Sequence, residues 1–226
     1  DPYVDFSRFD NDGPDGIPNS GDDDGIVDFL ITYSSAALGN NVGLGSSGLY
    51  LELGTAIETD DGVSIDDAYI VPEDMEVFEV EEITGMITPV GWLPPGMGFN
   101  FGLPDMTDND GSSVGTGIWS VMDYGFALTP PDYVMGAGPG HFCAWSKWQL
   151  GWLIPRTVSG PVSDLNIQSC ATAPDAARVF RANQPDADEY FLLEYKSNEA
   201  GTIFDRGYPL AAFDRGFLVW HIDDAL

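Results

Sequence analysis

Basic residues are absent from more than half of this chain. No Lys or Arg occurs between residues 9 and 146, and the whole chain has 37 Asp and Glu against eight Lys and Arg, a formal net charge of −29. Carboxylates without cationic partners must be solvated, screened by salt or tied by metal ions. The chain must therefore fold with most of its carboxylates at the surface or at cation sites. Adaptation to high salt would produce the same bias.

The charge and composition also limit the class of protein. So negative a chain is not a nucleic-acid binder, because phosphate backbones need cationic partners. With 226 residues, of which 43% are hydrophobic, the chain can bury a substantial core. No run approaches the roughly 18 to 20 apolar residues of a transmembrane helix. No signal peptide stands at the start, so we expect a processed or excised piece of a longer protein.

Two cysteines, Cys143 and Cys170, are the only ones in the chain. An even, sparse count in a carboxylate-rich chain predicts one disulfide, formed in an oxidising compartment. Two buried free thiols are the alternative, because a sequence does not give the distance between them.

The first 28 residues contain the strongest chemical signal. Carboxylates stand on alternate residues among glycines, and an apolar run follows directly, which argues for an anchored loop against a disordered acidic linker. Calcium prefers six to eight oxygen ligands, and such spacing points several carboxylates at one centre. The spacing resembles the Asp-x-Asp-x-Asp-Gly loops of dockerin-like and thrombospondin type 3 repeats, without the Glu of an EF-hand. The predicted ligands, for one or two ions, are Asp10, Asp12, Asp15, Asp22, Asp24 and Asp28.

Two further acidic segments give weaker signals. Asp105, Asp108 and Asp110 repeat the alternate spacing over a shorter stretch, which either a metal site or a turn capped by Asx side chains explains. Residues 58–82 hold acidic residues without a basic one, and we interpret this segment as solvated surface.

Periodicity and breakers predict the order of secondary structure. Three prolines and three glycines make a continuous helix through residues 88–98 unfavourable. We predict helices over 75–87 and 139–151, and strands over 25–33, 48–53, 67–72, 177–181, 189–195 and 216–222.

Ordered segments over nearly the whole chain resemble one protein family. The segments are 5–13, 69–73, 101–105, 117–125, 141–152, 189–195 and 216–223, and they are similar to the M6 peptidases, the immune inhibitor A group of secreted zinc proteases. The resemblance implies a secreted α+β protein of zincin or metzincin type, with calcium sites and a β-rich C-terminal part. It implies subdomains over 1–152 and 153–226. Met122 matches the methionine turn beneath the family's metal.

The chain departs from this family where the chemistry should be. In the family's His-Glu-x-x-His-x-x-Gly-x-x-Asp pattern, Pro95, Gly96 and Phe99 replace the first His, the Glu and the second His, while Asp105 falls at the third ligand. Loss of both imidazoles and the base removes the usual route to bind zinc and activate water. We therefore expect calcium but not zinc, no catalytic residues, and a structural, assembly or binding role with a protein partner or with itself.

Two alternatives remain open at this point. An active zinc endopeptidase would need a metal site rebuilt from Asp105, His141 or His221, or supplied elsewhere in a longer chain. The two histidines are otherwise hydrogen-bonded structural imidazoles. A retained cleft could also bind polypeptide without cutting it.

Overall fold

The computed structural model describes residues 3–35, 49–75, 86–131, 133–181, 184, 187–197, 203–208 and 215–225. They form helices and sheets, so the predicted α+β class is confirmed. The chain divides into two compact units, Asp1–Thr88 and Pro89–Leu226, which are described separately below. The predicted boundary between residues 152 and 153 falls inside the second unit.

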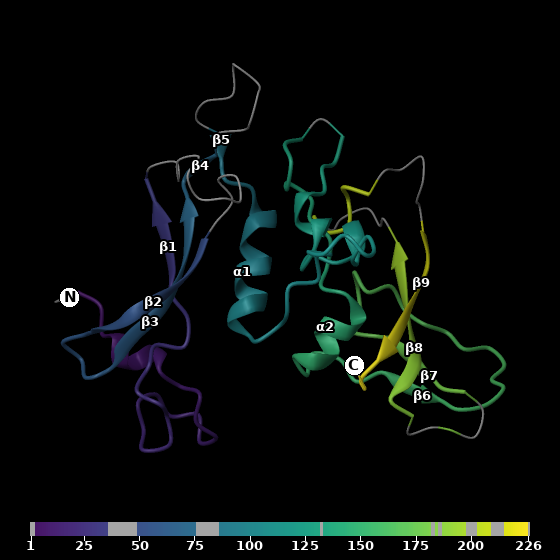
Figure 1. Cartoon of the computed structure of the whole chain (residues 1–226), viewed down its shortest axis with the longest axis horizontal. Helices are drawn as coiled ribbons and strands as arrows, with labels where there is room; N and C mark the ends of the chain where they lie inside the picture. Colours follow the sequence, from purple (N-terminus) through teal and green to yellow (C-terminus); the bar gives the residue numbers. More distant parts are fainter. Residues whose placement is uncertain are drawn as a thin grey trace. The chain divides into compact units, whose positions relative to one another are not determined.

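The first unit is built on a three-stranded sheet with the order β1-β3-β2 (Figure 1). β1 (Ile31–Ser34) runs parallel to β3 (Ser64–Pro72), and β2 (Leu49–Glu58) pairs with β3 as an antiparallel hairpin. Two short strands, β4 (Asp74–Met75) and β5 (Met86–Ile87), pair with each other. A 3-10 turn, η1 (Phe6–Phe9), precedes the acidic loop. A small core of Val27, Val63 and Ile65 lies where this loop joins the sheet.

Two predictions in this unit need correction or fall outside the described residues. The strands predicted at 48–53 and 67–72 are present and longer than expected. The strand predicted over 25–33 begins only at Ile31, because Gly25 has a φ of +80° and Ile26 makes a single bridge to Ser64. Most of the helix predicted over 75–87 lies on residues 76–85, outside the described residues. Its ends are strands, not helix.

The second unit opens with helical segments where the sequence predicted a break. After the 3-10 turn η2 (Val90–Trp92), α1 (Leu93–Asn100) is a continuous helix. The prediction was wrong for residues 93–98 because Pro94 and Pro95 lie in the first turn. The first four N–H groups of a helix have no partner within the helix, so proline loses nothing there.

The helix predicted over 139–151 is confirmed in its second half as α2 (Ala144–Gln149). Cys143 is its N-cap residue, and Gly151 takes a φ of +70° just beyond its end, a conformation that glycine adopts without strain. Two 3-10 turns, η3 (Gly117–Trp119) and η4 (Tyr124–Ala127), flank Met122. Met122 belongs to a buried cluster with Leu103 and Val121.

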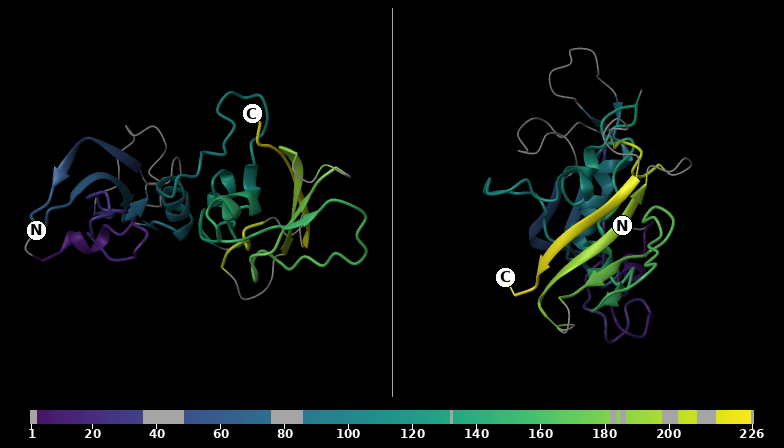
Figure 2. Two further views of the ribbon diagram at one scale, coloured as in Figure 1. Left: turned by 90° about the horizontal axis from the view of Figure 1, so that it is seen from below. Right: turned by 90° about the vertical axis from the view of Figure 1, so that its right-hand side faces the viewer.

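The chain ends in a four-stranded sheet with the order β6-β7-β8-β9. β6 (Arg156–Val158) is parallel to β7 (Ala177–Val179). β8 (Glu189–Ser197) is antiparallel to β7, and it is also antiparallel to β9 (Arg215–Asp223), with which it pairs along its whole length (Figure 2). The strands predicted at 177–181, 189–195 and 216–222 are therefore confirmed. Side chains of one face of β8 are buried, and along it two apolar residues precede two charged ones: Tyr190, Leu192, Glu194 and Lys196.

Candidate functional site

The acidic loop brings three carboxylates to one point. Ligand oxygens of Asp10, Asp12 and Asp28 all lie within 4.8 Å of one another. Asp12 and Asp28 are exposed, whereas the Asp10 side chain is completely buried. Three of the six predicted ligands thus converge, with one carboxylate at the back of the site and two at its rim.

Backbone hydrogen bonds hold this arrangement. The Asp28 N–H donates to the Phe9 carbonyl at 2.8 Å, and the Asn19 N–H donates to the Asp10 carbonyl at 2.7 Å. The Asn11 N–H donates to Asp28 Oδ2 at 3.1 Å. Ile26 also bridges to Ser64 of β3, so the end of the loop is attached to the sheet and its start is tied to that end through Asp28. The loop is therefore anchored, and the disordered-linker interpretation is wrong.

Asp10 is the informative member of the group. Both of its carboxylate oxygens are inaccessible to solvent, and neither has a hydrogen-bond partner among the described residues. Burial raises the pKa of Asp10, and the charges of Asp23, Asp24, Asp12 and Asp28 raise it further. Burial and neighbouring carboxylates also raise the pKa of Asp28, against the lowering effect of the Asn11 hydrogen bond. An unpartnered buried charge among like charges is unfavourable unless a cation neutralises it.

The donor set fits calcium. All three side chains offer carboxylate oxygens, with no imidazole or thiolate among them. Hard cations such as Ca²⁺ prefer oxygen ligands, whereas zinc sites in proteins draw mainly on His and Cys. The residues that would hold calcium are Asp10, Asp12 and Asp28.

The other predicted ligands of this loop mostly shape its backbone. Asp15 Oδ1 accepts from the Ile17 N–H, Asp22 accepts from the Ser20 hydroxyl, and Asp24 Oδ1 accepts from the Ile26 N–H. These three lie outside the converging group. Asp23, which was not predicted, accepts from the N–H groups of Gly13 and Ser20 at 2.7 and 2.6 Å and folds the loop back on itself. Nothing in three consecutive aspartates distinguishes the middle one, so the sequence carried no signal for this role.

The second acidic cluster is satisfied by its own turn. Asp105 accepts hydrogen bonds from Thr107 and from the Asn109 amide, and Asp108 accepts from the N–H groups of Asp110, Gly111 and Ser113. Burial raises the pKa of Asp105, but these hydrogen bonds outweigh it and leave the pKa below the ordinary value. The described geometry is that of Asx turns.

Helix α1 lies directly against Met122. A Cβ added to Gly98 would lie 2.3 Å from Met122 Sδ, so only glycine at this position allows so close an approach. Phe99, at the position of the second zinc histidine, packs against the cluster that contains Met122. Helix α1 therefore packs closely against the buried cluster of Met122, Leu103 and Val121.

The remaining candidate zinc ligands do not converge among the described residues. His221 is exposed and contacts Glu189 at 2.9 Å across β8 and β9. The His141 ring lies 4.0 Å from Asp205, and burial lowers the pKa of His141 to about 4, despite the opposing Asp205 charge. Within the described part of the chain, only the acidic loop brings three or more His, Cys, Asp or Glu side chains close enough to share an ion.

The predicted disulfide between Cys143 and Cys170 is wrong. Both cysteines are buried free thiols. Cys143 lies at the start of α2 with its sulfur 3.3 Å from the Ser146 hydroxyl, whereas the Cys170 thiol points to Asp205 Oδ2 at 3.6 Å. Each thiol therefore has its own polar neighbour, and burial raises the pKa of both.

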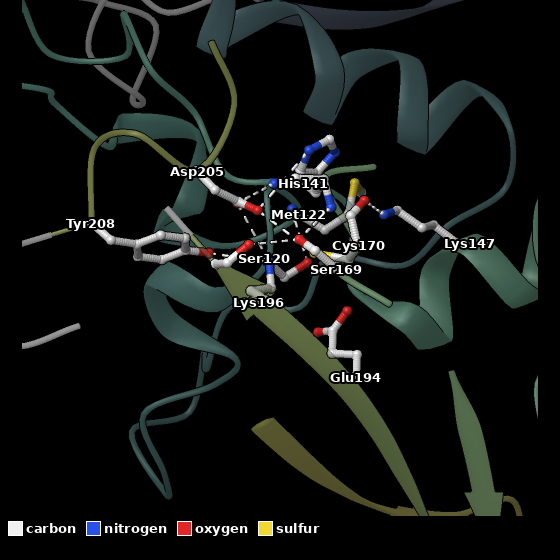
Figure 3. A network of polar contacts seen from close by, with 12 residues as sticks. Ser120, Met122, His141, Lys147, Ser169, Cys170, Glu194, Lys196, Asp205 and Tyr208 are labelled. Carbon is white, nitrogen blue, oxygen red and sulfur yellow. Dashed lines mark hydrogen bonds and ion pairs between the residues drawn. The ribbon is translucent and has the colours of Figure 1, made fainter. Parts of the chain in front are cut away.

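A buried polar network, which the sequence did not indicate, lies between β8 and the loop before β9 (Figure 3). Lys196 Nζ is 3.6 Å from Asp205 Oδ1 and 3.1 Å from the Tyr208 hydroxyl. Glu194 and Lys196 project from the same face of β8, and both are fully buried. The alternation of β8 gives their orientation, but only the tertiary structure supplies Asp205 as a partner.

Comparison with protein-family models and with curated proteins gives no match for this chain. In the described part of the chain, no helix has both the length and the apolar character needed to cross a membrane.

Proposed function

We propose that this chain is a calcium-stabilised, non-hydrolytic domain with the frame of an M6 peptidase, working outside the cell in a structural, assembly or binding role. The observation that carries the proposal is the fully buried Asp10 carboxylate. Neither of its oxygens is hydrogen-bonded within the described part of the chain, and two further carboxylates converge on it. A divalent cation resolves the unfavourable burial of that charge.

The metal is calcium and not zinc on the chemistry of the ligands. Calcium binds flexible sets of carboxylate and carbonyl oxygens, and extracellular modules operate with dissociation constants of about 10⁻⁴ to 10⁻³ M. A site with two exposed carboxylates suits such an affinity. Calcium at this site would stabilise the fold and would have no catalytic role.

The absence of peptide hydrolysis rests on the residues of α1. Pro95, Gly96 and Phe99 offer no ligand and no base. Of the three other candidate ligands, Asp105 and His221 are engaged in local hydrogen bonds, and the His141 ring lies 4.0 Å from Asp205, away from both. The packing of Gly98 against Met122 supports a retained frame. A frame without ligands supports a binding or assembly role, in which divalent ions bridge negative surfaces that would otherwise repel.

The calcium proposal predicts a shift in thermal stability. Adding a chelator should lower the melting temperature of the metal-loaded protein by several degrees, because ligand release removes RT ln(1 + [L]/Kd) from the free energy of unfolding. Calcium titration by calorimetry gives the stoichiometry. The matched control is Asp15→Asn, which should bind calcium as the wild type does, because Asp15 lies outside the converging group. A melting temperature unchanged by chelator would reject structural calcium.

The non-hydrolytic proposal predicts no zinc-dependent proteolysis. Purified protein supplied with zinc should leave an unfolded protein substrate intact, and metal analysis should find calcium without stoichiometric zinc. The triple change Pro95→His, Gly96→Glu and Phe99→His should also fail to create activity, since Phe99 is packed in an apolar cluster. Chelator-sensitive cleavage by the wild type, together with bound zinc, would establish the rebuilt-site alternative instead.

A further inference from the structure

The buried contact between Lys196 and Asp205 is set up for covalent chemistry. Both side chains are completely buried, and Nζ lies 3.6 Å from Oδ1. A primary amine and a carboxyl group held in contact without water can condense to an amide, because proximity gives intramolecular reactions effective molarities of roughly 10⁵ to 10⁸ M. We propose that Lys196 and Asp205 become joined by a side-chain amide that ties β8 to the loop preceding β9.

The reaction needs no further reactant. The ammonium and the carboxylate of the ion pair become one amide and one water molecule, with no change in oxidation state. A proton first moves from Nζ to the carboxylate, giving a neutral amine and a neutral acid. The Nζ lone pair then forms a bond to Asp205 Cγ, and a Cγ–oxygen bond breaks.

The two carboxylate oxygens of Asp205 have different surroundings, which assigns their roles. Oδ1 accepts the His141 backbone N–H at 3.0 Å, so this donor stabilises negative charge on the oxygen that is retained. Oδ2 lies 3.6 Å from the Cys170 thiol and 4.0 Å from His141 Nε2, and it is the oxygen that leaves as water. His141 Nε2 is buried, and no described residue makes a hydrogen bond to it. The Asp205 backbone is itself held, since its N–H donates to the Pro139 carbonyl at 2.7 Å.

Glu194 is placed to help move the protons. It is fully buried on the same face of β8, two residues from Lys196. Its Oε1 accepts from Trp220 Nε1 at 2.9 Å, and its Oε2 has no hydrogen-bond partner among the residues that the structure describes. Burial raises the pKa of Glu194 against the lowering effect of the Lys196 charge, and within the proposal Glu194 exchanges protons with the amine. Glu194 holds the transferred proton only temporarily, so it is unchanged once the amide has formed.

The electrostatics of Lys196 predict a slow reaction. Burial lowers its pKa, but the carboxylates of Glu194 and Asp205 outweigh this effect and hold the pKa well above the ordinary value. The amine form is therefore scarce, and the amide should form slowly after folding. Aged, folded protein is the sample in which to measure it.

Intact mass spectrometry under denaturing conditions is the direct test. The folded wild type should be lighter than its sequence by the mass of one water, and digestion should yield a branched peptide joining Lys196 to Asp205. Lys196→Arg keeps the cation but cannot form this amide, so it should have its full sequence mass. Lys147→Arg, which changes the only other lysine, should retain the loss of water.

The same measurement can overturn the proposal. A folded wild type with its full sequence mass would do so. So would a loss of water that persists in Lys196→Arg, because cyclisation at the aspartyl-glycine sequences of the acidic loop also releases one water. Glu194→Gln should fold, as judged by circular dichroism, and should lose water more slowly. An unchanged rate would remove the role of Glu194.

Discussion

At the scale of single residues, the calcium site depends on burial more than on charge. The chain offers 37 acidic side chains, yet Asp10 is distinguished because it is fully enclosed and has no hydrogen bond to its carboxylate. Its exposed neighbours can remain charged at little cost in free energy, because water solvates them. The site is therefore recognised by a buried carboxylate that has no hydrogen bond to either oxygen among the described residues.

Asp10→Asn should change the stability in opposite directions with and without calcium. In chelator the neutral amide removes charge repulsion, and the melting temperature should rise by a few degrees above that of the wild type. In calcium the variant loses a charged ligand, and its melting temperature should fall below that of the wild type. Scanning calorimetry of both proteins under both conditions tests this. The same sign in both conditions would contradict a cation-binding role for Asp10.

The pH dependence of the calcium-free protein follows from the raised pKa of Asp10. Between the ordinary aspartate pKa of 3.8 and the raised folded value, the native state binds more protons than the unfolded state. The contribution of Asp10 to the free energy of unfolding therefore increases as the pH falls through its folded pKa. The wild type minus Asp10→Asn difference in chelator should show this rise on acidification. With calcium bound the difference should reverse, since protonation displaces the ion.

At the scale of secondary structure elements, α1 illustrates how a glycine sets a packing distance. Gly98→Ala should destabilise the protein by about 1–3 kcal/mol, because its Cβ would overlap the buried Met122 sulfur. Chemical denaturation measures this cost. Gly160→Ala is the control and should be nearly neutral, since nothing lies within 4 Å of its added Cβ. Met122→Ala should make Gly98→Ala less costly. Purely additive effects would mean that the two residues are not coupled.

At the scale of the whole molecule, the unfolding of the two units can be followed separately, because tryptophan fluorescence reports on only one of them. All six tryptophans lie in Pro89–Leu226, whereas the calcium loop lies in Asp1–Thr88. Each unit has its own core, so calcium should act on the unit that binds it. Chelation should therefore shift the thermal transition followed by far-ultraviolet circular dichroism and leave the tryptophan fluorescence transition in place. Equal shifts of both signals would show instead that the units unfold together.

Local pattern was sufficient for much of the fold. The strand β8 and the end of α2 before Gly151 follow from backbone periodicity and capping, which are properties of neighbouring residues. The start of α2 at Ala144, five residues after the expected Pro139, does not. The strand expected over 25–33 was shortened, because contacts of the acidic loop with β3 override its apolar pattern. Helix α1 was not predicted, because its prolines lie in the first turn, where they cost the helix no hydrogen bond.

The sequence by itself determined the mixed fold class, the acidic loop as a cation candidate and the lack of zinc ligands on α1, because composition, spacing and the absence of a side chain are readable without coordinates. Only the tertiary structure decided which aspartates converge, that Asp10 is unsatisfied, that the two cysteines remain thiols, and that Lys196 meets Asp205. Those facts depend on distances between residues far apart in the chain and on exclusion of water, which no local pattern encodes.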